Sequence, residues 1–223
     1  MSQAPSRPAP PALLLFDFGG VIADEGFVGG LAAIARANAI DPGVLLQLAV
    51  DIIFSSGYLI GQAKESLFWE QLRSRAAIRG DDVALRGELL TRFRLRPRMM
   101  DIVDRLRAAG RQVAVLSDQT NWLDEIESAQ PFAHRFDRIF NSYHVGLHKR
   151  DPACFTNALE TMGFRAGQAL FVDDLHQNTE LARNLGLRAI HYREQGQFET
   201  ELLPCCPEIA FPDPKETSRD HGE

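Results

Sequence analysis

The sequence predicts an α/β fold, a doubly wound parallel sheet with a small α-helical cap inserted into it. Short apolar runs alternate along the chain with longer helical patterns, and this alternation is typical of parallel strands joined by helices. A stretch with helical periodicity alone follows the first apolar run. With 223 residues, the chain has the length of one domain that carries an insertion.

The first expected strand is the stretch around which the rest of the chain is organised. Residues 13–16 are continuously apolar, as buried parallel strands are, and Asp17 and two glycines follow at once. Glycines allow the chain to turn sharply after the strand. An acid at the carboxyl end of a strand lies where open α/β sheets bind ligands, although an aspartate that caps a turn gives the same pattern.

Residues 25–96 carry helical signals without a convincing strand. Apolar residues recur at helical spacing in four groups, which Asp41-Pro-Gly and Gly80-Asp-Asp separate. Because these helices directly follow the first strand, we interpret them as an inserted cap; the alternative is a helical part of a single core. The expected boundaries are 13–24 and 97–203 for the sheet domain, and 1–12 and 204–223 for disordered tails.

The second half of the chain alternates between helices and strands. Pro97 fits the first residue of a helix that ends at Gly110. Asp151 and Pro152 fit the N-cap and the first residue of a later helix. Further strands are expected at 113–116, 138–141, 169–172 and around 189–191.

Polar side chains end three of the expected strands. They are Asp17 after the first strand, Ser117 and Asp118 after the second, and Asp173 and Asp174 after the fourth. Because the carboxyl ends of parallel strands lie at one edge of a sheet, we expect these side chains to converge. Lys149 precedes a helix start between the last two of these strands and is the expected cation of the group.

This set of residue types suits phosphoryl transfer. A carboxylate can attack phosphorus and form an aspartyl-phosphate, which divides one difficult step into two. Carboxylate oxygens are the ligands that Mg²⁺ prefers, and the ion neutralises charge between an anionic nucleophile and an anionic substrate. A hydroxyl and a lysine supply further donors to the phosphoryl oxygens. Each residue alone also fits a cap, a turn or a solvated charge, so the prediction depends on their combination.

In this order the motifs resemble those of the haloacid dehalogenase superfamily of hydrolases. Asp17-Phe-Gly-Gly-Val-Ile-Ala-Asp24 resembles the first motif, Leu116-Ser117 the second, Lys149 the third and Phe171-Val-Asp173-Asp174 the fourth. The resemblance covers about residues 13–192. It implies a Rossmann-like core, with the helical insertion at the place where this superfamily carries its small cap.

The resemblance also implies a role for each matching residue. Asp17 is then the nucleophile, and the residues that hold the phosphorylated substrate are Ser117, Asp118 and Lys149. The implied Mg²⁺ ligands are Asp17, the backbone carbonyl of Gly19 and Asp174, with Asp173 beside them and not directly coordinated. Asp24 is expected to shape the turn and to take no part in the chemistry.

Two positions depart from the family pattern. Most phosphatases of this superfamily carry an acid two residues after the nucleophile, where this chain has Gly19, which cannot protonate a leaving alkoxide. The Gly-Gly-Val-Ile form is similar to a subgroup that includes bacterial sugar-1-phosphate phosphatases, whose leaving groups need the acid least. Arg150 stands where the family commonly has proline. We therefore predict a Mg²⁺-dependent phosphomonoester hydrolase acting on a small phosphorylated metabolite, with a sugar phosphate as a candidate.

Two other functions fit parts of the pattern. A 2-haloacid dehalogenase also lacks the second acid, but a metal-free site has little use for the adjacent charges of Asp173 and Asp174. A catalytically weak domain, disabled by Gly19, would bind metal without turnover. His144, His148 and His176 lie near the motifs; the last is the better candidate for approaching a leaving group, and all three also fit exposed loop positions.

The composition of the chain excludes several kinds of partner and location. The net charge of -6 argues against a nucleic-acid or anionic-membrane partner, although a local site on an acidic protein can still be positive. No apolar run approaches a membrane span, and the N-terminus lacks a signal pattern. The three cysteines fit neither a disulfide framework nor a zinc site. We expect a cytoplasmic protein with reduced thiols.

Overall fold

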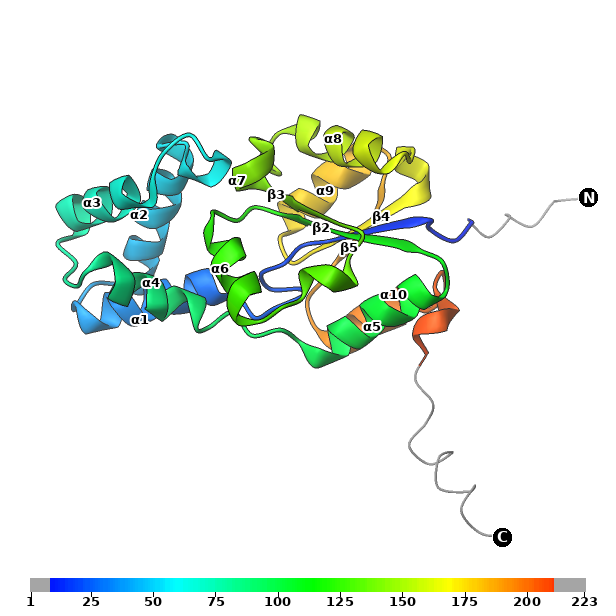
Figure 1. Cartoon of the computed structure of the whole chain (residues 1–223), viewed down its shortest axis with the longest axis horizontal. Helices are drawn as coiled ribbons and strands as arrows, with labels where there is room; N and C mark the ends of the chain where they lie inside the picture. The colour runs from blue at the N-terminus through cyan, green and yellow to red at the C-terminus, as the bar shows by residue number, and fades with distance from the viewer. Residues whose placement is uncertain (1–8, 211–223) are drawn as a thin grey trace, which may run out of the picture.

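One sheet of five parallel strands forms the centre of the molecule, with the strand order β3-β2-β1-β4-β5 (Figure 1). The computed structural model of the chain describes residues 9–210. The strands are β1 (Leu13–Phe16), β2 (Gln112–Ser117), β3 (Arg138–Asn141), β4 (Ala169–Asp173) and β5 (Arg188–His191). The predicted parallel α/β fold is confirmed.

Helices cover both faces of this sheet, because alternate side chains of β1 point to opposite sides. Leu14 and Phe16 belong to a core shared with α5 (Pro97–Ala108) and α10 (Gln195–Leu202). Leu13 and Leu15 belong to a second core shared with α8 (Pro152–Met162) and α9 (His176–Asn184). All four β1 side chains are fully buried, which explains why the strand reads as a continuous apolar run.

Local sequence signals account for the helix ends. Proline occupies the first position of both α5 and α8, where its missing N–H costs nothing. The Asp151 carboxylate accepts a 2.9 Å hydrogen bond from the Ala153 N–H at the start of α8. Gly163 ends that helix with a left-handed φ of 76°, a conformation that glycine adopts without strain.

Four helices between β1 and α5 pack around a core of their own, at one end of the molecule (Figure 1). They are α1 (Gly26–Ala37), α2 (Pro42–Ser55), α3 (Glu65–Ala76) and α4 (Asp82–Leu90), with the short 3₁₀ helix η1 (Tyr58–Ile60). We call residues 26–90 the helical segment. Its core is centred on buried Phe68, Trp69 and Leu72.

The helical segment is joined to the sheet through α6 (Trp122–Ala129) and α7 (Ser142–Val145). Trp122 is buried in the core of the helical segment, with its ring 5.7 Å from that of Tyr58 and 5.8 Å from that of Trp69. The Tyr58 hydroxyl donates a 2.6 Å hydrogen bond to Asn121 Oδ1. Both contacts lie just beyond β2, so the segment is held over the carboxyl ends of the strands.

Part of the expected C-terminal tail is ordered, which corrects the sequence interpretation. Residues 204–210 include the 3₁₀ helix η4 (Pro207–Ile209), and Cys206 and Ile209 are buried against the α5 side of the sheet. Glu208 forms a 2.8 Å ion pair with Arg111. Similarly, Ala12 of the expected N-terminal tail hydrogen-bonds to Gln168 and Gln112. The rest of the expected tails, 1–8 and 211–223, lies outside the described residues.

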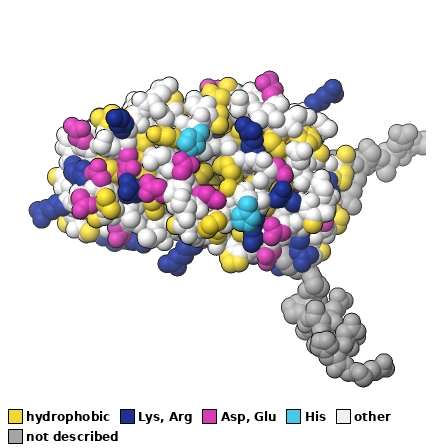
Figure 2. Space-filling view, in the orientation of Figure 1, with side chains coloured by type: hydrophobic (Ala, Val, Ile, Leu, Met, Phe, Trp, Pro, Cys, Tyr) yellow, Lys and Arg dark blue, Asp and Glu magenta, His cyan; other side chains and the backbone are white. Residues whose placement is uncertain are grey.

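Two short 3₁₀ helices, η2 (Ala133–Arg135) and η3 (Ala166–Gln168), complete the described chain. Within 9–210, no helix is both long and apolar enough to cross a bilayer. Acidic and basic side chains are interspersed over the face of the molecule in Figure 2, so the described residues visible there form no large patch of one sign.

Candidate active site

Asp17 lies at the carboxyl end of β1, in the middle of the sheet. Its backbone N–H continues the pairing with β4 by donating to the Val172 carbonyl at 2.9 Å. Its carboxylate Oδ1 accepts hydrogen bonds from the Ser117 hydroxyl at 2.6 Å and from the Phe18 N–H at 2.7 Å. The side chain is buried but borders a cavity, so Asp17 is held in place and still open to a ligand.

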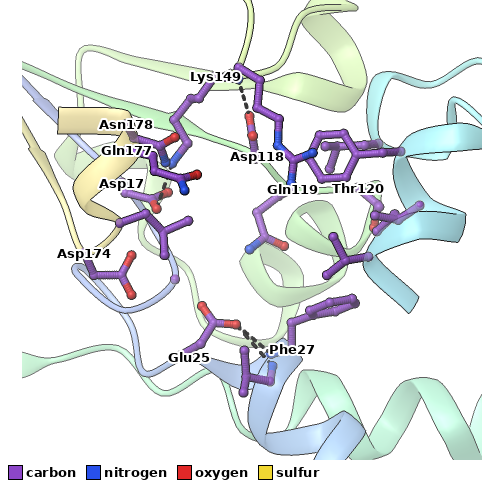
Figure 3. Close-up of a pocket in the computed structure, with 18 of the residues that line it drawn as sticks. Asp17, Glu25, Phe27, Asp118, Gln119, Thr120, Lys149, Asp174, Gln177 and Asn178 are labelled. Atoms are coloured by element: carbon purple, nitrogen blue, oxygen red, sulfur yellow. Dashed lines mark hydrogen bonds and ion pairs between the residues drawn. The ribbon is translucent and has the colours of Figure 1, made fainter. Parts of the chain in front are cut away.

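Lys149 reaches Asp17 from the loop before α8 (Figure 3). Its ammonium nitrogen lies 2.7 Å from Asp17 Oδ2 and 2.6 Å from Asp173 Oδ2. The Lys149 backbone N–H donates to Asp118 Oδ1 at 2.9 Å, so Asp118 fixes the loop that presents the lysine. The lysine side chain is only 2% exposed, and the two carboxylates supply the partners that a buried ammonium requires.

The two acids at the end of β4 lie in different surroundings. Asp173 is fully buried, and besides Lys149 its carboxylate accepts from the Leu175 N–H at 2.7 Å and from the Asn178 amide at 3.1 Å. Asp174 is half-buried and borders the cavity. One carboxylate oxygen each from Asp17, Asp173 and Asp174 lies within 4.8 Å of the others, and such an oxygen cluster fits a divalent ion such as Mg²⁺.

Burial and charge act against each other in this cluster. Burial raises the pKa of Asp17, the Lys149 ammonium lowers it, and the neighbouring carboxylates raise it further, to a net rise. Burial lowers the pKa of Lys149, but the carboxylates of Asp17 and Asp173 outweigh burial and raise it. The lysine therefore stays protonated and offers its charge to an anionic ligand. Burial, and then the charge of Asp173, also raises the pKa of Asp174.

The loop after Asp17 packs tightly against Asp174. Gly20 has a left-handed φ of 78°, and a Cβ added there would run into the Asp174 carboxylate, so glycine is required at this position. Arg96 closes the loop by donating to the Gly20 carbonyl at 2.6 Å and pairing with Asp24 at 3.1 Å. Asp24 thus holds the turn, in keeping with the expectation that it plays a structural part.

The missing side chain at residue 19 leaves a space that Glu25 fills. A Cβ added to Gly19 would lie 2.5 Å from Glu25 Oε2. The other oxygen of Glu25 accepts from the Phe27 N–H at 3.1 Å and the Val28 N–H at 3.3 Å, which caps α1. Burial raises the pKa of the Glu25 carboxyl. Figure 3 shows Glu25 facing the same hollow as Asp174 and Asp17.

A cavity of about 540 Å³ extends from these carboxylates to the helical segment. Its wall on α2 is an apolar stripe at helical spacing, formed by Leu46, Val50, Ile53 and Phe54. Gln47, Gln119, Thr120 and Gln177 add polar groups around it. The Arg150 guanidinium lies 3.8 Å from the centre of the Phe54 ring, so the residue that replaces proline is a cavity-lining cation.

The structure brings together every residue that the sequence predicts for the site: Asp17, Gly19, Ser117, Asp118, Lys149, Asp173 and Asp174. The three histidines do not line the cavity. His176 is exposed and stacks on His191, His144 pairs with Asp124, and His148 packs edge-on against Phe54.

Sequence reasoning missed Glu25 and Asn178. Glu25 stands beside Asp24 in the first motif and directly before a helical pattern, which are the only signals that pointed to it. Asn178 follows Asp174 by four residues and lies in the first turn of α9, from where it reaches back to Asp173. Both depend on where a helix begins, which a motif does not specify.

Comparison with known proteins identifies the family. The model of the haloacid dehalogenase-like hydrolases matches residues 11–186, which include strands β1 to β4 and the helical segment. The chain belongs to this family. It is therefore a hydrolase by descent, with the family's α/β fold.

Sequence relatives of this hydrolase match only over short stretches. Acyl-CoA dehydrogenase family member 10 of Mus musculus is 34% identical over 95 residues, which are 42% of this chain and 9% of that protein. Bifunctional epoxide hydrolase 2 of Rattus norvegicus is 25% identical over 47% of this chain and 20% of that protein. The chain thus spans a fifth or less of the length of these relatives.

Solved structures match the hydrolase over most of its length. A HAD family enzyme from Bacteroides thetaiotaomicron has a TM-score of 0.70 at 19% identity and covers 86% of this chain and 98% of its own. The same enzyme in complex with magnesium and inorganic phosphate has a TM-score of 0.67 at 21% identity, over 82% and 94% of the two chains. The L-2-haloacid dehalogenase of Xanthobacter autotrophicus, with chloropropionic acid covalently bound, has a TM-score of 0.61 at 17% identity, over 86% and 82%. At these identities the likeness extends to the fold alone.

Proposed function

We propose that this hydrolase is a Mg²⁺-dependent phosphomonoesterase that works through an aspartyl-phosphate. The observation that carries the proposal is the Asp17 carboxylate, held by Ser117 and Lys149 at the mouth of a cavity and beside the acidic pair of β4. The magnesium and phosphate bound to the similar Bacteroides enzyme support the same chemistry.

In this mechanism each residue of the site has its own role in a two-step reaction. A carboxylate oxygen of Asp17 forms a bond to phosphorus while the ester oxygen leaves with a proton. Water then attacks the phosphorus of the aspartyl-phosphate, which releases inorganic phosphate and restores the Asp17 carboxylate. Ser117 and Lys149 donate to the phosphoryl oxygens as charge develops there. Asp17, Asp174 and the Gly19 carbonyl would hold Mg²⁺, which would neutralise charge between the nucleophile and the substrate.

Asp173 acts by positioning in this proposal. All its contacts go to Lys149, the Leu175 N–H and Asn178, so little of its carboxylate is left for direct coordination. Asp174 borders the cavity with its side chain and is the better direct ligand. The assignment agrees with the one that the family resemblance implies.

The helical segment then serves as the cap, and the substrate lies between α2 and the sheet edge. The apolar stripe of α2 favours a small organic phosphate with some hydrocarbon surface, whereas the glutamines around it serve hydroxyl groups such as those of a sugar. Arg150, stacked on Phe54, offers a second cation to an anionic substrate.

A haloacid dehalogenase is the second candidate, because the Xanthobacter enzyme has the same fold. In that reaction an aspartate attacks carbon and needs no ion. The three clustered carboxylates favour the phosphatase, since a metal-free site gains nothing from the repulsion between them.

The deciding experiment compares wild type with Asp17→Asn, each with Mg²⁺ and with a chelator. Phosphate release is measured from 4-nitrophenyl phosphate, hexyl phosphate, a sugar-1-phosphate and a sugar-6-phosphate. We expect Mg²⁺-dependent release by the wild type and a loss of at least about 10³-fold in the variant, because the nucleophile is gone. Release that survives Asp17→Asn contradicts the mechanism. No release from any phosphate, with chloride release from 2-chloropropionate, selects the dehalogenase.

A further inference from the structure

The proposed phosphatase reaction needs a proton donor for the leaving oxygen, and the usual position for it, residue 19, has no side chain. The acidic side chains that border the cavity are Asp17, Glu25, Asp118 and Asp174. Asp17 is the proposed nucleophile, Asp118 fixes the Lys149 loop and Asp174 is a proposed metal ligand. Among the acids of this described cavity wall, Glu25 alone has a carboxylate oxygen, Oε2, to which we have assigned no other role.

The position of Glu25 matches that of the missing group. A Cβ built on Gly19 would lie 2.5 Å from Glu25 Oε2, so the glutamate carboxyl occupies space beside residue 19 that a side chain there would need. Glu25 reaches this volume from the start of α1 (Figure 3). The glycine and the glutamate are therefore sterically linked, since a side chain on residue 19 would displace the Glu25 carboxyl.

The carboxyl is also held in one orientation. Oε1 accepts from two backbone N–H groups at the start of α1, which leaves Oε2 directed at the Gly19 loop. A side chain fixed in this way loses little freedom when it acts on a substrate, which is what a catalytic acid requires.

We propose that Glu25 is a catalytic residue that supplies the acid and base function absent from residue 19. As the bond between phosphorus and the ester oxygen breaks, the Glu25 carboxyl gives its proton to that oxygen. The resulting carboxylate takes a proton from the water that attacks the aspartyl-phosphate, and the cycle closes with one water consumed. This inference depends on the proposed phosphatase activity.

The test uses Glu25→Gln and two aryl phosphates of similar size, 4-nitrophenyl phosphate and phenyl phosphate. The amide oxygen of the introduced glutamine can still accept from the N–H groups at the start of α1, so the cap is kept. Nitrophenolate is a stable anion and leaves without a proton. Phenolate is a poorer leaving group, so its departure depends more on a proton donor. We expect kcat/KM to fall by about 10²-fold or more for phenyl phosphate and by less than about 10-fold for 4-nitrophenyl phosphate.

The second part of the experiment moves the carboxyl group from residue 25 to residue 19. Glu25→Ser keeps a capping oxygen at the start of α1 and clears the space beside residue 19. Adding Gly19→Asp to it restores the carboxyl at the position usual for the family, and Gly19 has no left-handed φ that would oppose aspartate. We expect the double variant to recover at least about 10-fold of the phenyl phosphate activity that Glu25→Ser loses.

A matched control is Asp41→Asn. Asp41 caps α2 by accepting two backbone hydrogen bonds, as Glu25 does for α1, and asparagine removes its charge. We expect this variant to keep the wild-type kcat/KM for both aryl phosphates. Equal losses for both aryl phosphates in Glu25→Gln overturn the inference and indicate a structural role. A wild type that cleaves 4-nitrophenyl phosphate but not phenyl phosphate also overturns it, since no donor then acts. Failure of the phosphatase proposal differs from both, because the wild type then cleaves neither compound.

Discussion

At the scale of single residues, Lys149 determines how the site is held together. It is one of the largest fully buried side chains among residues 9–210, and its ammonium binds two carboxylates at 2.6–2.7 Å. A buried charge persists only when partners compensate the loss of water. We therefore expect Lys149 to matter for stability as well as for the proposed phosphate binding, and one substitution tests both.

Lys149→Met keeps the length and the apolar stem of the side chain but leaves Asp17 and Asp173 without their cation. We expect a loss of about 3–5 kcal/mol in the free energy of unfolding, because breaking a buried ion pair leaves uncompensated charge. Urea denaturation in the presence of a chelator measures this loss, and phosphate release should fall below detection. Lys64→Met, at an exposed lysine of the helical segment, is the control and should change neither quantity. A variant of Lys149 as stable as the wild type would contradict this account.

Three motif residues were predictable from the sequence because each lies at the carboxyl end of a buried strand. Once the strands are parallel, Asp17, Ser117 and Asp173 have to meet at one edge. Glu25 was not predictable in this way, because its place depends on the path of the loop after β1. The packing of Arg150 against Phe54 joins two elements distant in the chain, and no local pattern specifies it.

At the scale of elements, apolar runs, prolines and capping residues were enough to predict the strands and helices from the sequence. They were not enough to predict the structure of the C-terminal residues 204–210. Residues 204–210 contain two prolines, Pro204 and Pro207, yet Cys206 and Ile209 fill space beside α5 that only the folded sheet creates. Strand order is likewise a tertiary property, since the sequence alone does not state which strands are neighbours. The boundaries of the cap stay a prediction, as does the cytoplasmic location.

An ion pair between α5 and α10 gives a prediction at the element scale. Arg98 binds both carboxylate oxygens of Glu199, at 2.7 and 2.6 Å, and this contact lowers the pKa of Glu199. A carboxyl with a lowered pKa contributes stability above its unfolded pKa of about 4.5, and that contribution is lost as the pH falls through the folded pKa.

Glu199→Gln should therefore lower the free energy of unfolding at pH 7 by at most about 1 kcal/mol, since the pair is partly exposed. The difference in stability between wild type and variant should be smaller near pH 3 than at pH 7, because the contribution of the Glu199 carboxylate is lost as the pH falls below about 4.5 and through its lowered folded pKa. Urea denaturation at the two pH values measures the difference. Glu201→Gln, on the same helix, is the control. A difference that is as large at pH 3 as at pH 7 would show that the charge is not its cause.

At the scale of the whole molecule, two separately packed bodies meet at the site. The sheet with its flanking helices supplies the carboxylates and the lysine, and the helical segment supplies the apolar stripe of α2. Trp122 of α6 packs into the core of the helical segment, and the Tyr58 hydroxyl donates to Asn121; both contacts join the two bodies. A ligand held by both bodies should therefore stabilise the whole chain, and not the sheet domain alone.

Ligand binding at the site is testable by thermal unfolding with and without Mg²⁺ and inorganic phosphate. A ligand present at 100 times its Kd adds about 2.7 kcal/mol to the folded state, which corresponds to a rise in Tm of roughly 5–11 °C for a chain of this size. Asp174→Asn should lose most of the rise due to Mg²⁺, because it removes a charged oxygen from the cluster. Asp101→Asn, at an exposed position of α5, should retain it. If Asp174→Asn keeps the full rise while the wild type responds to Mg²⁺, the ion binds elsewhere and the proposed ligand set is wrong.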